Sequence, residues 1–451
     1  MTITYDLGAF VARVGAEGAP AEAQAVAKVG FIDSIATMIA GTREAATRVL
    51  HAALSPLPAG RSQLWFSAEH CAAPEAAWLN GVAAHALDFD DVALRGHPSA
   101  VLVPAILAEG QDLGCTGSQM LSAYVAGYEV WANLVDRERD IHHTKGWHPT
   151  GVFGAIGAAA ACSALRRLDG SQCTHALGLG ASQSAGIMSN FGSMAKPFHA
   201  GRAAHAGIIS ARLAAAGFTA SPDALEHPQG FLAAISPHGN VDRNRAVGPL
   251  GERWQIVARR MNLKKYPTCY YIHRALDAIL SLLARTSIDH RDVVQVDVTM
   301  SKEHALVLRN HAPSNALEAK FSIEFAMSGA LVAGKMGLAE LHDDFVRSEA
   351  VQRLYAHVRV HHSTVYDPET PGAALSDEVT VTTSDGSRHA SEPVHHARGH
   401  AQAPLSHAEL HAKFVECLQY GGFDGDSARL FERLDRMEGL DASKLTAEIG
   451  V

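Results

Sequence analysis

Helical segments rich in small residues dominate the first half of this chain and most constrain its fold. Across residues 99–260, apolar positions recur at helical spacing and are broken by Gly, Pro and Ser, with no convincing strand among them. Ala and Gly are abundant and aromatic residues make up 6% of the chain, which suits helices that pack closely through small side chains. The predicted helices cover approximately 99–111, 116–138, 150–167, 171–189, 199–217 and 221–234.

The residues before this region are predicted to be helical as well. Helical spacing from residue 1 to about 55 predicts a helical hairpin, and the same spacing returns over 74–89. Between them, residues 56–73 form a linker with a strand-like run at Leu64-Trp65-Phe66. We therefore predict a large, mostly helical domain over residues 1–265.

The composition changes after about residue 285, where alternating apolar and polar residues predict strands. These runs are Val293–Met300, Val358–His362 and Glu378–Thr383, the last followed by a Ser384-Asp385-Gly386-Ser387 turn. Two helix-like stretches lie between them, at about 320–335 and 337–356. We predict a smaller α+β domain over 266–404. Helical spacing returns over 405–451, and that spacing alone leaves open which domain these helices join.

The overall composition limits the possible partners and locations. An apolar content of 47% is that of a soluble globular protein, and 38 basic against 47 acidic residues, without a basic tail, argue against nucleic acid. Six cysteines, none in a C-x-x-C motif, fit a reducing cytoplasm. The start of the chain lacks a signal core and no run reaches 18 strongly apolar residues, so we expect no membrane association.

Four cationic or titratable groups stand next to prolines that suit the first turn of a helix. They are His97 before Pro98, His148 before Pro149, Lys196 before Pro197, and Lys264-Lys265 near Pro267, which places His273 about two turns along the next segment. Lys196 is expected just before its helix. Because a helix N-terminus carries unpaired N–H groups and partial positive charge, each entrance attracts an anion. If the entrances converge, they form a pocket for a small molecule with several carboxylates.

Three carboxylates lie close together in Asp88-Phe89-Asp90-Asp91, a stretch followed by His97. It fits a solvated acidic loop, and a calcium loop is a weaker alternative because the glycine and downstream glutamate of an EF-hand are absent. In a third interpretation, one carboxylate turns inward and acts as a general base with His97 as its partner.

Lys196 and His148 also leave alternatives open. Lysines are rarely buried unless paired. Lys196 is therefore either a buried clamp for a carboxylate, able to act as a base as well, or a surface lysine with its head in water. His148 lies between an aromatic residue and a proline, which predicts a half-buried ring that serves as a helix cap, a core residue or a catalyst.

Several other sites are disfavoured by the sequence. Histidine doublets occur, yet the chain has no H-E-x-x-H, no H-x-H and no Cys/His quartet, so we expect no catalytic metal. The stretch Gly178-Leu179-Gly180-Ala181-Ser182 is similar to a dinucleotide fingerprint, but it lies in a helical segment with no strand before it. Ser182 and Ser184 lack the G-x-S-x-G elbow. We expect no cofactor.

Several stretches of the chain, taken in order, resemble the MmgE/PrpD family over nearly the whole length. The resemblance is carried by His85-Ala86-Leu87-Asp88-Phe89-Asp90-Asp91, Gly96-His97-Pro98-Ser99, Gly127-Tyr128-Glu129-Val130, Gly146-Trp147-His148-Pro149-Thr150-Gly151, Lys196-Pro197-Phe198-His199-Ala200-Gly201, Lys265-Tyr266-Pro267-Thr268-Cys269 with His273 and Asp277-Ala278, and Glu318-Ala319-Lys320-Phe321-Ser322-Ile323.

This resemblance implies a large helical domain completed by the returning C-terminal helices, a smaller α+β lid, a homodimer and a metal-free site. Family members move a proton next to a carboxylate of a di- or tricarboxylate. The catalytic positions implied here are Asp88, His97, His148, Lys196 and His273, and the implied substrate-binding positions are Lys196, His97, His148, Lys265 and Cys269.

The family includes 2-methylcitrate dehydratase, cis-aconitate decarboxylase and iminodisuccinate epimerase, so the resemblance implies one of three outcomes. The decarboxylase has a threonine where this chain has Val92, and its loop before the His-Pro is one residue longer, which speaks against decarboxylation in particular. We expect dehydration of a 2-methylcitrate-like substrate, with epimerisation of an iminodisuccinate-like dicarboxylate or decarboxylation of the cis-aconitate type as the alternatives. A helical protein that only binds a carboxylate metabolite is the non-enzymatic alternative.

Overall fold

The chain forms two compact units in the computed structural model, which describes residues 2–65, 67–138, 140–370 and 372–446. The first unit comprises Met1–Asn262 and Glu409–Val451, and the second Leu263–Ala408. With 56% of residues in helices and 10% in strands, the expected mostly helical class is confirmed. That the two units are separate domains remains a prediction.

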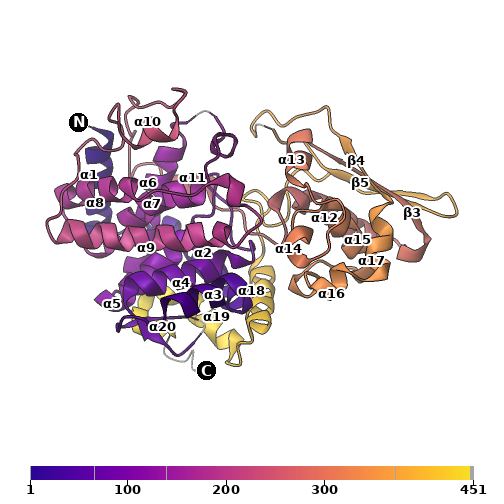
Figure 1. The fold of residues 1–451 in the computed structure, drawn as a ribbon, viewed down its shortest axis with the longest axis horizontal. Helices are drawn as coiled ribbons and strands as arrows, with labels where there is room; N and C mark the ends of the chain where they lie inside the picture. The colour runs from indigo at the N-terminus through magenta and orange to yellow at the C-terminus, as the bar shows by residue number, and fades with distance from the viewer. Residues whose placement is uncertain (1, 66, 139, 371, 447–451) are drawn as a thin grey trace. The chain divides into compact units, whose positions relative to one another are not determined.

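Helices make up most of the first unit, as Figure 1 shows. They are α1 (Ile3–Glu17), α2 (Ala21–Ala40), α3 (Ala45–Leu54), α4 (Ala73–Ala86), α5 (Ser99–Leu113), α6 (Gly117–Val135), α7 (Pro149–Leu165), α8 (Gly170–Ser182), α9 (Ala195–Ala215), α10 (Phe231–Ile235) and α11 (Gln255–Arg259). The hairpin α1–α2 is followed by a third helix within the first 55 residues. The strand-like run at residues 64–66 is replaced by the short pair β1 (Ser62–Gln63) and β2 (His70–Cys71), and Phe66 lies outside the described residues.

Two of the predicted helices are longer than the helices in the structure. Residues 221–234 form mainly turns and only α10 is helical, because Pro222 and Pro228 cannot donate the backbone bonds that a continuous helix needs. Helix α8 ends at Ser182 instead of residue 189, ahead of Gly186, whose φ of 131° is incompatible with a helix.

The centre of the first unit is α7, every residue of which is buried. Helices α6, α8 and α9 pack around it through small side chains. A Cβ atom added at Gly207 of α9 would lie 2.3 Å from the Cβ of Ala158 in α7, so glycine permits this close approach. The Ala- and Gly-rich composition thus produces the tight helix packing that the sequence predicts.

One segment of the described chain, Ala21–Arg43, is long and apolar enough to cross a membrane by length and composition. In the structure, 72% of its most apolar 18-residue window is buried inside the protein, as in the core helix of a globular unit.

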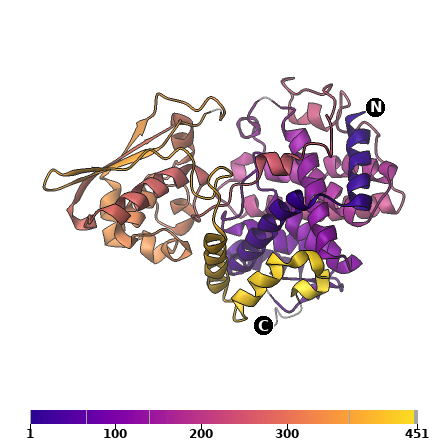
Figure 2. The same cartoon turned by 180° about the vertical axis from the view of Figure 1, so that it is seen from behind.

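The C-terminal helices belong to the first unit. They are α18 (His407–Gly421), α19 (Ser427–Asp435) and α20 (Ala442–Thr446). Helix α19 packs on α2 and α20 on α5, and Figure 2 shows these yellow helices against the early part of the chain. Backbone bonds join the ends, since Gly117 donates to the carbonyl of Leu440 and Ala442 donates to that of Cys115.

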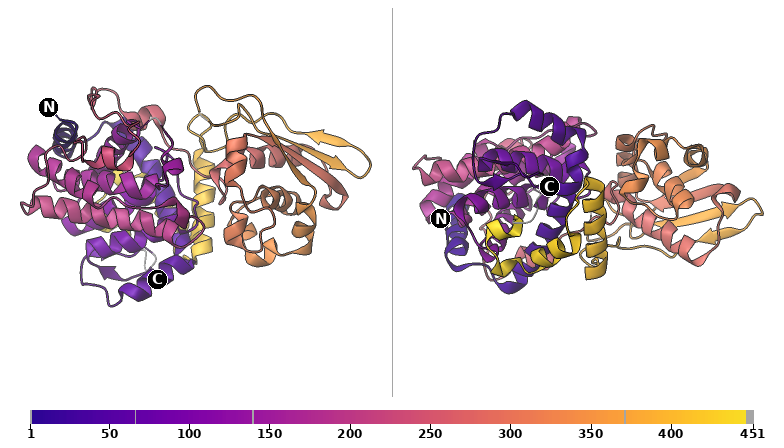
Figure 3. Two further views of the ribbon diagram at one scale, coloured as in Figure 1. Left: turned by 45° about the horizontal axis from the view of Figure 1, so that its top comes forward. Right: turned by 90° about the horizontal axis from the view of Figure 1, so that it is seen from below.

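A four-stranded sheet organises the second unit, in the order β4 (Val358–His362), β3 (Val293–Met300), β5 (Glu378–Thr383) and β6 (Arg388–Ala390). Strand β4 runs parallel to β3, whereas β5 and β6 follow in antiparallel order. Helices α12 (His273–Arg285) and α15 (Ile323–Ala333) cover one face (Figure 3). Their side chains share a core with the buried valines of β3 and β5. The three strands and the turn predicted at 384–387 are confirmed.

Shorter helices complete this unit: α13 (Lys302–Val307), α14 (Ala316–Ala319), α16 (Asp343–Val346) and α17 (Glu349–Tyr355). The single helix expected at 337–356 is broken, because His342 and Ser348 adopt extended backbone conformations ahead of α16 and α17.

Candidate active site

Three of the four predicted entrances do begin helices. Pro98 directly precedes α5, Pro149 is the first residue of α7, and Pro197 is the third residue of α9. Lys196 therefore lies inside the first turn of α9 and not before it. This is possible because the N–H that proline lacks is among those without a partner in the first turn of a helix.

The fourth helix entrance, expected after Lys264-Lys265 at Pro267, was predicted incorrectly. Pro267 is followed by a 3₁₀ turn at Tyr270–Ile272, and His273 is itself the first residue of α12. His273 is fully buried, and its ring lies 5.2 Å from that of Tyr266. The Lys265 ammonium lies 5.5 Å from the same tyrosine ring, and Cys269 is buried nearby in the second unit. His273, Lys265 and Cys269 thus form part of that unit, and their roles at a site remain predictions.

The acidic stretch between α4 and α5 is buried, which contradicts the interpretation as a solvated loop. Asp90 and Asp91 have no exposed surface, and Asp88 is 8% exposed. Asp88, Leu94 and Arg95 all adopt left-handed backbone conformations, with φ values of 53°, 51° and 60°. Such strained residues persist where the surrounding structure holds them, and they cluster at functional sites.

An ion pair joins this loop to α9. The Nζ of Lys196 lies 2.7 Å from Oδ1 of Asp88, and Nε2 of His97 lies 3.8 Å from the same oxygen. Lys196 is 7% exposed, which excludes the surface-lysine interpretation. Its ammonium also lies 5.4 Å from the centre of the Phe191 ring. The side chains of Asp88, His97 and Lys196 therefore meet, so two of the four helix entrances bring their cationic or titratable groups to one carboxylate.

Asp90 holds the imidazoles of His85 and His97 next to the ion pair of Lys196 and Asp88. Nδ1 of His85 lies 2.9 Å from Oδ1 of Asp90, and Nδ1 of His97 lies 3.0 Å from Oδ2. Burial alone would raise the pKa of Asp90, but these two rings outweigh it and hold the pKa well below its usual range. Because carboxylate oxygens accept hydrogen bonds, each neutral ring carries its proton on Nδ1 and keeps a lone pair on Nε2.

The ring of His148 lies on the other side of His85. Its centre is 5.9 Å from that of His85 and 4.8 Å from that of Phe191, and its Nδ1 lies 3.1 Å from Nδ1 of His199. The ring is 1% exposed, so the expectation of a half-buried side chain was wrong: α9 covers it from the side. Burial, together with the charge of Lys196, lowers the pKa of His148 well below its usual value.

The electrostatic character of the site follows from these contacts. Burial also lowers the pKa of His85, to about 4, and that of His199. The imidazoles of His85, His148 and His199 are therefore neutral at neutral pH, close to the ion pair of Lys196 and Asp88. Such a group offers basic nitrogens, an acidic N–H and a cation for an anionic ligand, which are the requirements of proton transfer next to a carboxylate.

The same cluster has the donor set of a metal site. His85, Asp88, Asp90 and His97 each present one ligand atom within 4.8 Å of the others. The ammonium of Lys196, however, already lies at hydrogen-bond distance from Asp88, and both Nδ1 atoms face Asp90. A divalent ion would have to displace this ammonium to reach Asp88.

The site residues assigned from the sequence did not include three members of the cluster: His85, Asp90 and His199. Asp90 was only one of three candidate carboxylates in its stretch. His199 follows Lys196 by three residues, so both lie on one face of α9, a signal that was available from the sequence. His85 lies in the last turn of α4, five residues before Asp90, but only the folded loop brings their side chains together.

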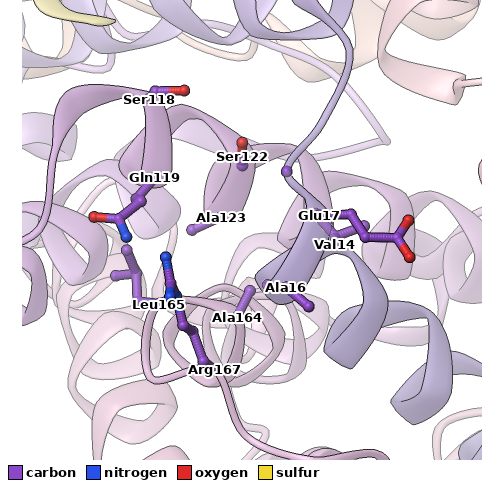
Figure 4. Close-up of a pocket in the computed structure, with 12 residues that line it drawn as sticks. Val14, Ala16, Glu17, Ser118, Gln119, Ser122, Ala123, Ala164, Leu165 and Arg167 are labelled. Carbon is purple, nitrogen blue, oxygen red and sulfur yellow. The ribbon is translucent and has the colours of Figure 1, made fainter. Parts of the chain in front are cut away.

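A separate recess lies at the other end of α7 (Figure 4). Ala164 and Leu165 of α7 line it together with Glu17, Gln119 and Arg167. None of the predicted site residues is among its lining residues.

Comparison with known proteins agrees with the resemblance inferred from the sequence. Residues 5–244 match the MmgE/PrpD N-terminal domain, and residues 266–436 match the MmgE/PrpD C-terminal domain.

Curated relatives carry consistent names. Cis-aconitate decarboxylase of Homo sapiens is 27% identical over 324 residues, covering 69% of this chain and 66% of the human protein, just under two thirds of its length. The protein of the same name from Aspergillus terreus is 25% identical over 414 residues, covering 85% of this chain and 83% of the relative. Cis-aconitate decarboxylase-like protein oryM of Aspergillus oryzae is 26% identical over 335 residues, 69% of each chain.

The family and these names support an enzyme of the lyase type. Since the two domain matches cover most of the chain, this protein belongs to the MmgE/PrpD family.

Proposed function

We propose that this protein is a metal-independent lyase for a small di- or tricarboxylate and that it acts by proton transfer at a carbon next to a carboxylate. The observation that carries the proposal is the buried pair of Lys196 and Asp88, at 2.7 Å, beside the imidazole of His97. The pair supplies a cation for a substrate carboxylate and a carboxylate able to accept a proton.

Charge stabilisation is the central part of the proposed mechanism. Removing a proton next to a carboxylate places negative charge on that carboxylate, and a preorganised cation in a buried site lowers the energy of this state. Lys196 is such a buried cation, and the N–H groups at the N-termini of α7 and α9 add partial positive charge.

Proton transfer is assigned to Asp88 and the imidazole nitrogens. Asp88 faces both the ammonium of Lys196 and Nε2 of His97, and a proton that it accepts can pass to that nitrogen, which keeps a lone pair. His85 and His97 keep basic Nε2 atoms as long as Asp90 accepts from their Nδ1 atoms. A positioned acid or base contributes roughly 10²- to 10⁴-fold to the rate.

Decarboxylation of a cis-aconitate-like substrate is the first candidate reaction, because the curated relatives carry that name. When the carbon–carboxyl bond breaks and CO₂ leaves, the electron pair of that bond remains on the carbon skeleton, and an acid of the cluster supplies the proton that captures it.

Dehydration of a 2-methylcitrate-like substrate is the second candidate, favoured by Val92 at the position where the decarboxylase has a threonine. In this reaction a base removes a proton from carbon, the electron pair forms the double bond, and the leaving hydroxide takes a proton from an acid. The same residues serve both reactions, and the position of the leaving group on the bound substrate decides between them.

The oligomeric state, the location and the cofactor requirement of the protein are proposals as well. We propose a homodimer in the cytoplasm that needs no cofactor. Six free cysteines, all buried in the structure, are consistent with a reducing compartment.

One experiment separates the candidate reactions. The purified protein is incubated in deuterated water with cis-aconitate, 2-methylcitrate or iminodisuccinate, and each mixture is followed by NMR. Loss of a carboxyl group identifies the decarboxylase, formation of an alkene the dehydratase, and deuterium uptake with inversion an epimerase. Binding without turnover of any of the three would identify a carboxylate-binding protein and contradict the proposal.

Two variants and a control connect the reaction to the site. Lys196→Ala and His148→Ala should abolish turnover and preserve the fold. Lys28→Met removes another partly buried lysine of the first unit, whose Nζ lies 3.0 Å from Oε1 of Glu438, and should retain turnover. Equal activity of all three variants would exclude the cluster as the active site.

A further inference from the structure

A buried lysine of the C-terminal helix α18 contacts the loop that carries the candidate catalytic carboxylates. Nζ of Lys413 donates a hydrogen bond of 2.8 Å to the carbonyl oxygen of Phe89, which lies between Asp88 and Asp90. The same ammonium lies 4.1 Å from the centre of the Phe89 ring. One cation thus contacts both the backbone and the side chain of this residue.

The position of Lys413 is fixed from its other side by α2. Its Nζ lies 2.5 Å from Oδ1 of Asp33, and their side chains are 5% and 0% exposed. Burial raises the pKa of Asp33, and the charge of Lys413 opposes this shift. A buried lysine with both a carboxylate and a carbonyl partner is held rigidly, because any other orientation leaves a charge unpaired in the core.

We propose that Lys413 is a positioning residue for the candidate active site: it fixes the peptide group that joins Phe89 to Asp90 and so sets the orientation of the carboxylates of Asp88 and Asp90. This inference rests on the proposed function of the cluster. Asp88 has a left-handed backbone conformation, which requires support from its surroundings. The hydrogen bond from Lys413 to the next residue provides such support at the point of strain.

A second contact holds the other end of the same stretch. Val92 and Asn262 exchange two backbone hydrogen bonds, of 2.8 and 2.9 Å. Asn262 is the last residue before Leu263–Ala408, and Lys413 lies four residues after Glu409, where the chain returns to the first unit. Residues of the first unit on either side of that segment therefore contact the stretch from Phe89 to Val92, although Lys413 and Phe89 are 324 positions apart.

The effect expected from losing this support is a catalytic one. A displacement of about 1 Å in a catalytic group can cost on the order of 100-fold in rate. Lys413→Met keeps the length of the side chain but removes the donor and the charge. We expect it to lower kcat about 10- to 100-fold with KM changed less than about threefold, whereas Lys413→Arg, which keeps a donor and a charge, restores most of the kcat.

Hydrogen exchange measured by mass spectrometry supplies a readout that does not depend on turnover. Amide exchange in residues 88–92 should become about tenfold faster in Lys413→Met than in the wild type. The matched control is Lys28→Met, because Lys28 on α2 also bonds C-terminal residues, and its ammonium donates to the carbonyl of Asp435 and the carboxylate of Glu438 instead of to the loop. The control should change neither kcat nor exchange in 88–92.

A double variant keeps the test decisive if Lys413→Met fails to fold. Asp33→Asn combined with Lys413→Met removes the buried charge that the single change leaves unpaired. Wild-type kcat together with wild-type exchange in a folded Lys413→Met or double variant would overturn the proposal. If the wild type converts none of the three substrates, the proposed function fails, and the exchange comparison alone then decides whether Lys413 holds the loop.

Discussion

The ammonium of Lys196 lies 2.7 Å from Oδ1 of Asp88, although the two residues are 108 positions apart. Both side chains are nearly buried, so the pair is shielded from solvent and each charge depends on the other. Their contact joins the first turn of α9 to the loop after α4 and forms the centre of the candidate active site.

Replacing Lys196 by methionine should therefore abolish most of the catalysis. We expect kcat to fall by about 10²- to 10⁴-fold, because the cation that stabilises the developing charge is lost. Asp88→Asn should have an effect of similar size, and the double variant should be little worse than either single one, since the residues act as a unit. Steady-state kinetics of the four proteins tests this, and additive losses would show that the two residues act independently.

Asp90→Asn should impair catalysis without touching the Lys196–Asp88 pair. An asparagine amide presents one acceptor oxygen and an NH₂ group, so one of the two imidazoles must move its proton from Nδ1 to Nε2. We expect a loss of about 10²- to 10⁴-fold in kcat and an altered pH–rate profile, as for a misoriented catalytic histidine.

The control for this change is Asp112→Asn. Asp112 also pairs with a cation, Arg212, but its side chain is 34% exposed and lies at the C-terminal end of α5, whereas His97 precedes the N-terminal end of that helix. It should retain wild-type kcat. A pH–rate profile for Asp90→Asn that coincides with that of the wild type would refute the role of Asp90 in setting the imidazole tautomers.

Much of the fold follows from the sequence because local patterns decide it. Strand β3 has the predicted bounds, Val293–Met300, since alternation with one buried face is specific to strands. The start of α7 is predicted by Pro149, within one residue. Residues 221–234 were misassigned because helical spacing was given more weight than the two prolines within them.

The site was only partly predictable for a different reason. Proline marks the entrances that hold His97, His148 and Lys196, so these residues could be proposed from sequence alone. The burial of Asp90 and its contact with His85 depend on how α4 and the following loop pack, which no local pattern encodes. Lys413 is even less predictable from the sequence, since its partner Phe89 lies 324 positions earlier in the chain.

Stability should fall in mild acid because buried histidines resist protonation. Burial lowers the pKa of His85 to about 4, below the usual value of 6.5. Between pH 6.5 and 4 the unfolded chain therefore binds the proton more readily than the folded one, and stability is lost as the pH falls through this window. Burial gives the same shift, also to about 4, in His142, His143, His205 and His304.

Buried acids act in the opposite direction. Burial raises the pKa of Glu129 and Asp377 to about 7, so their contribution to stability decreases as the pH rises from about 4 to 7. Burial also raises the pKa of Asp33, Asp91 and Asp277, whereas His148, His199 and His400 join the histidines with lowered pKa values. Eight such histidines against five such acids among the described residues lead us to expect a net loss on acidification. Denaturant unfolding at pH 7, 6 and 5 measures it, and His85→Asn should reduce the slope by at most about 1.4 kcal/mol per pH unit. An unchanged slope would show that His85 does not resist protonation.

Close packing of α4 and α9 should be needed for both stability and activity. An ideal Cβ atom on Gly201 of α9 would lie 2.3 Å from the carbonyl oxygen of Trp78 in α4, and one on Gly81 would lie 2.7 Å from the Cα of Gly201. Gly201→Val must therefore push α9 away from α4, at a cost of about 1–3 kcal/mol, which lowers the melting temperature by several degrees. Because Lys196 begins α9 and Asp88 follows α4, their separation should increase and kcat should fall. Gly439→Ala is the control, since a Cβ there meets no atom within 4 Å. A Gly201→Val protein with the melting temperature and kcat of Gly439→Ala would show that the two helices do not need this contact.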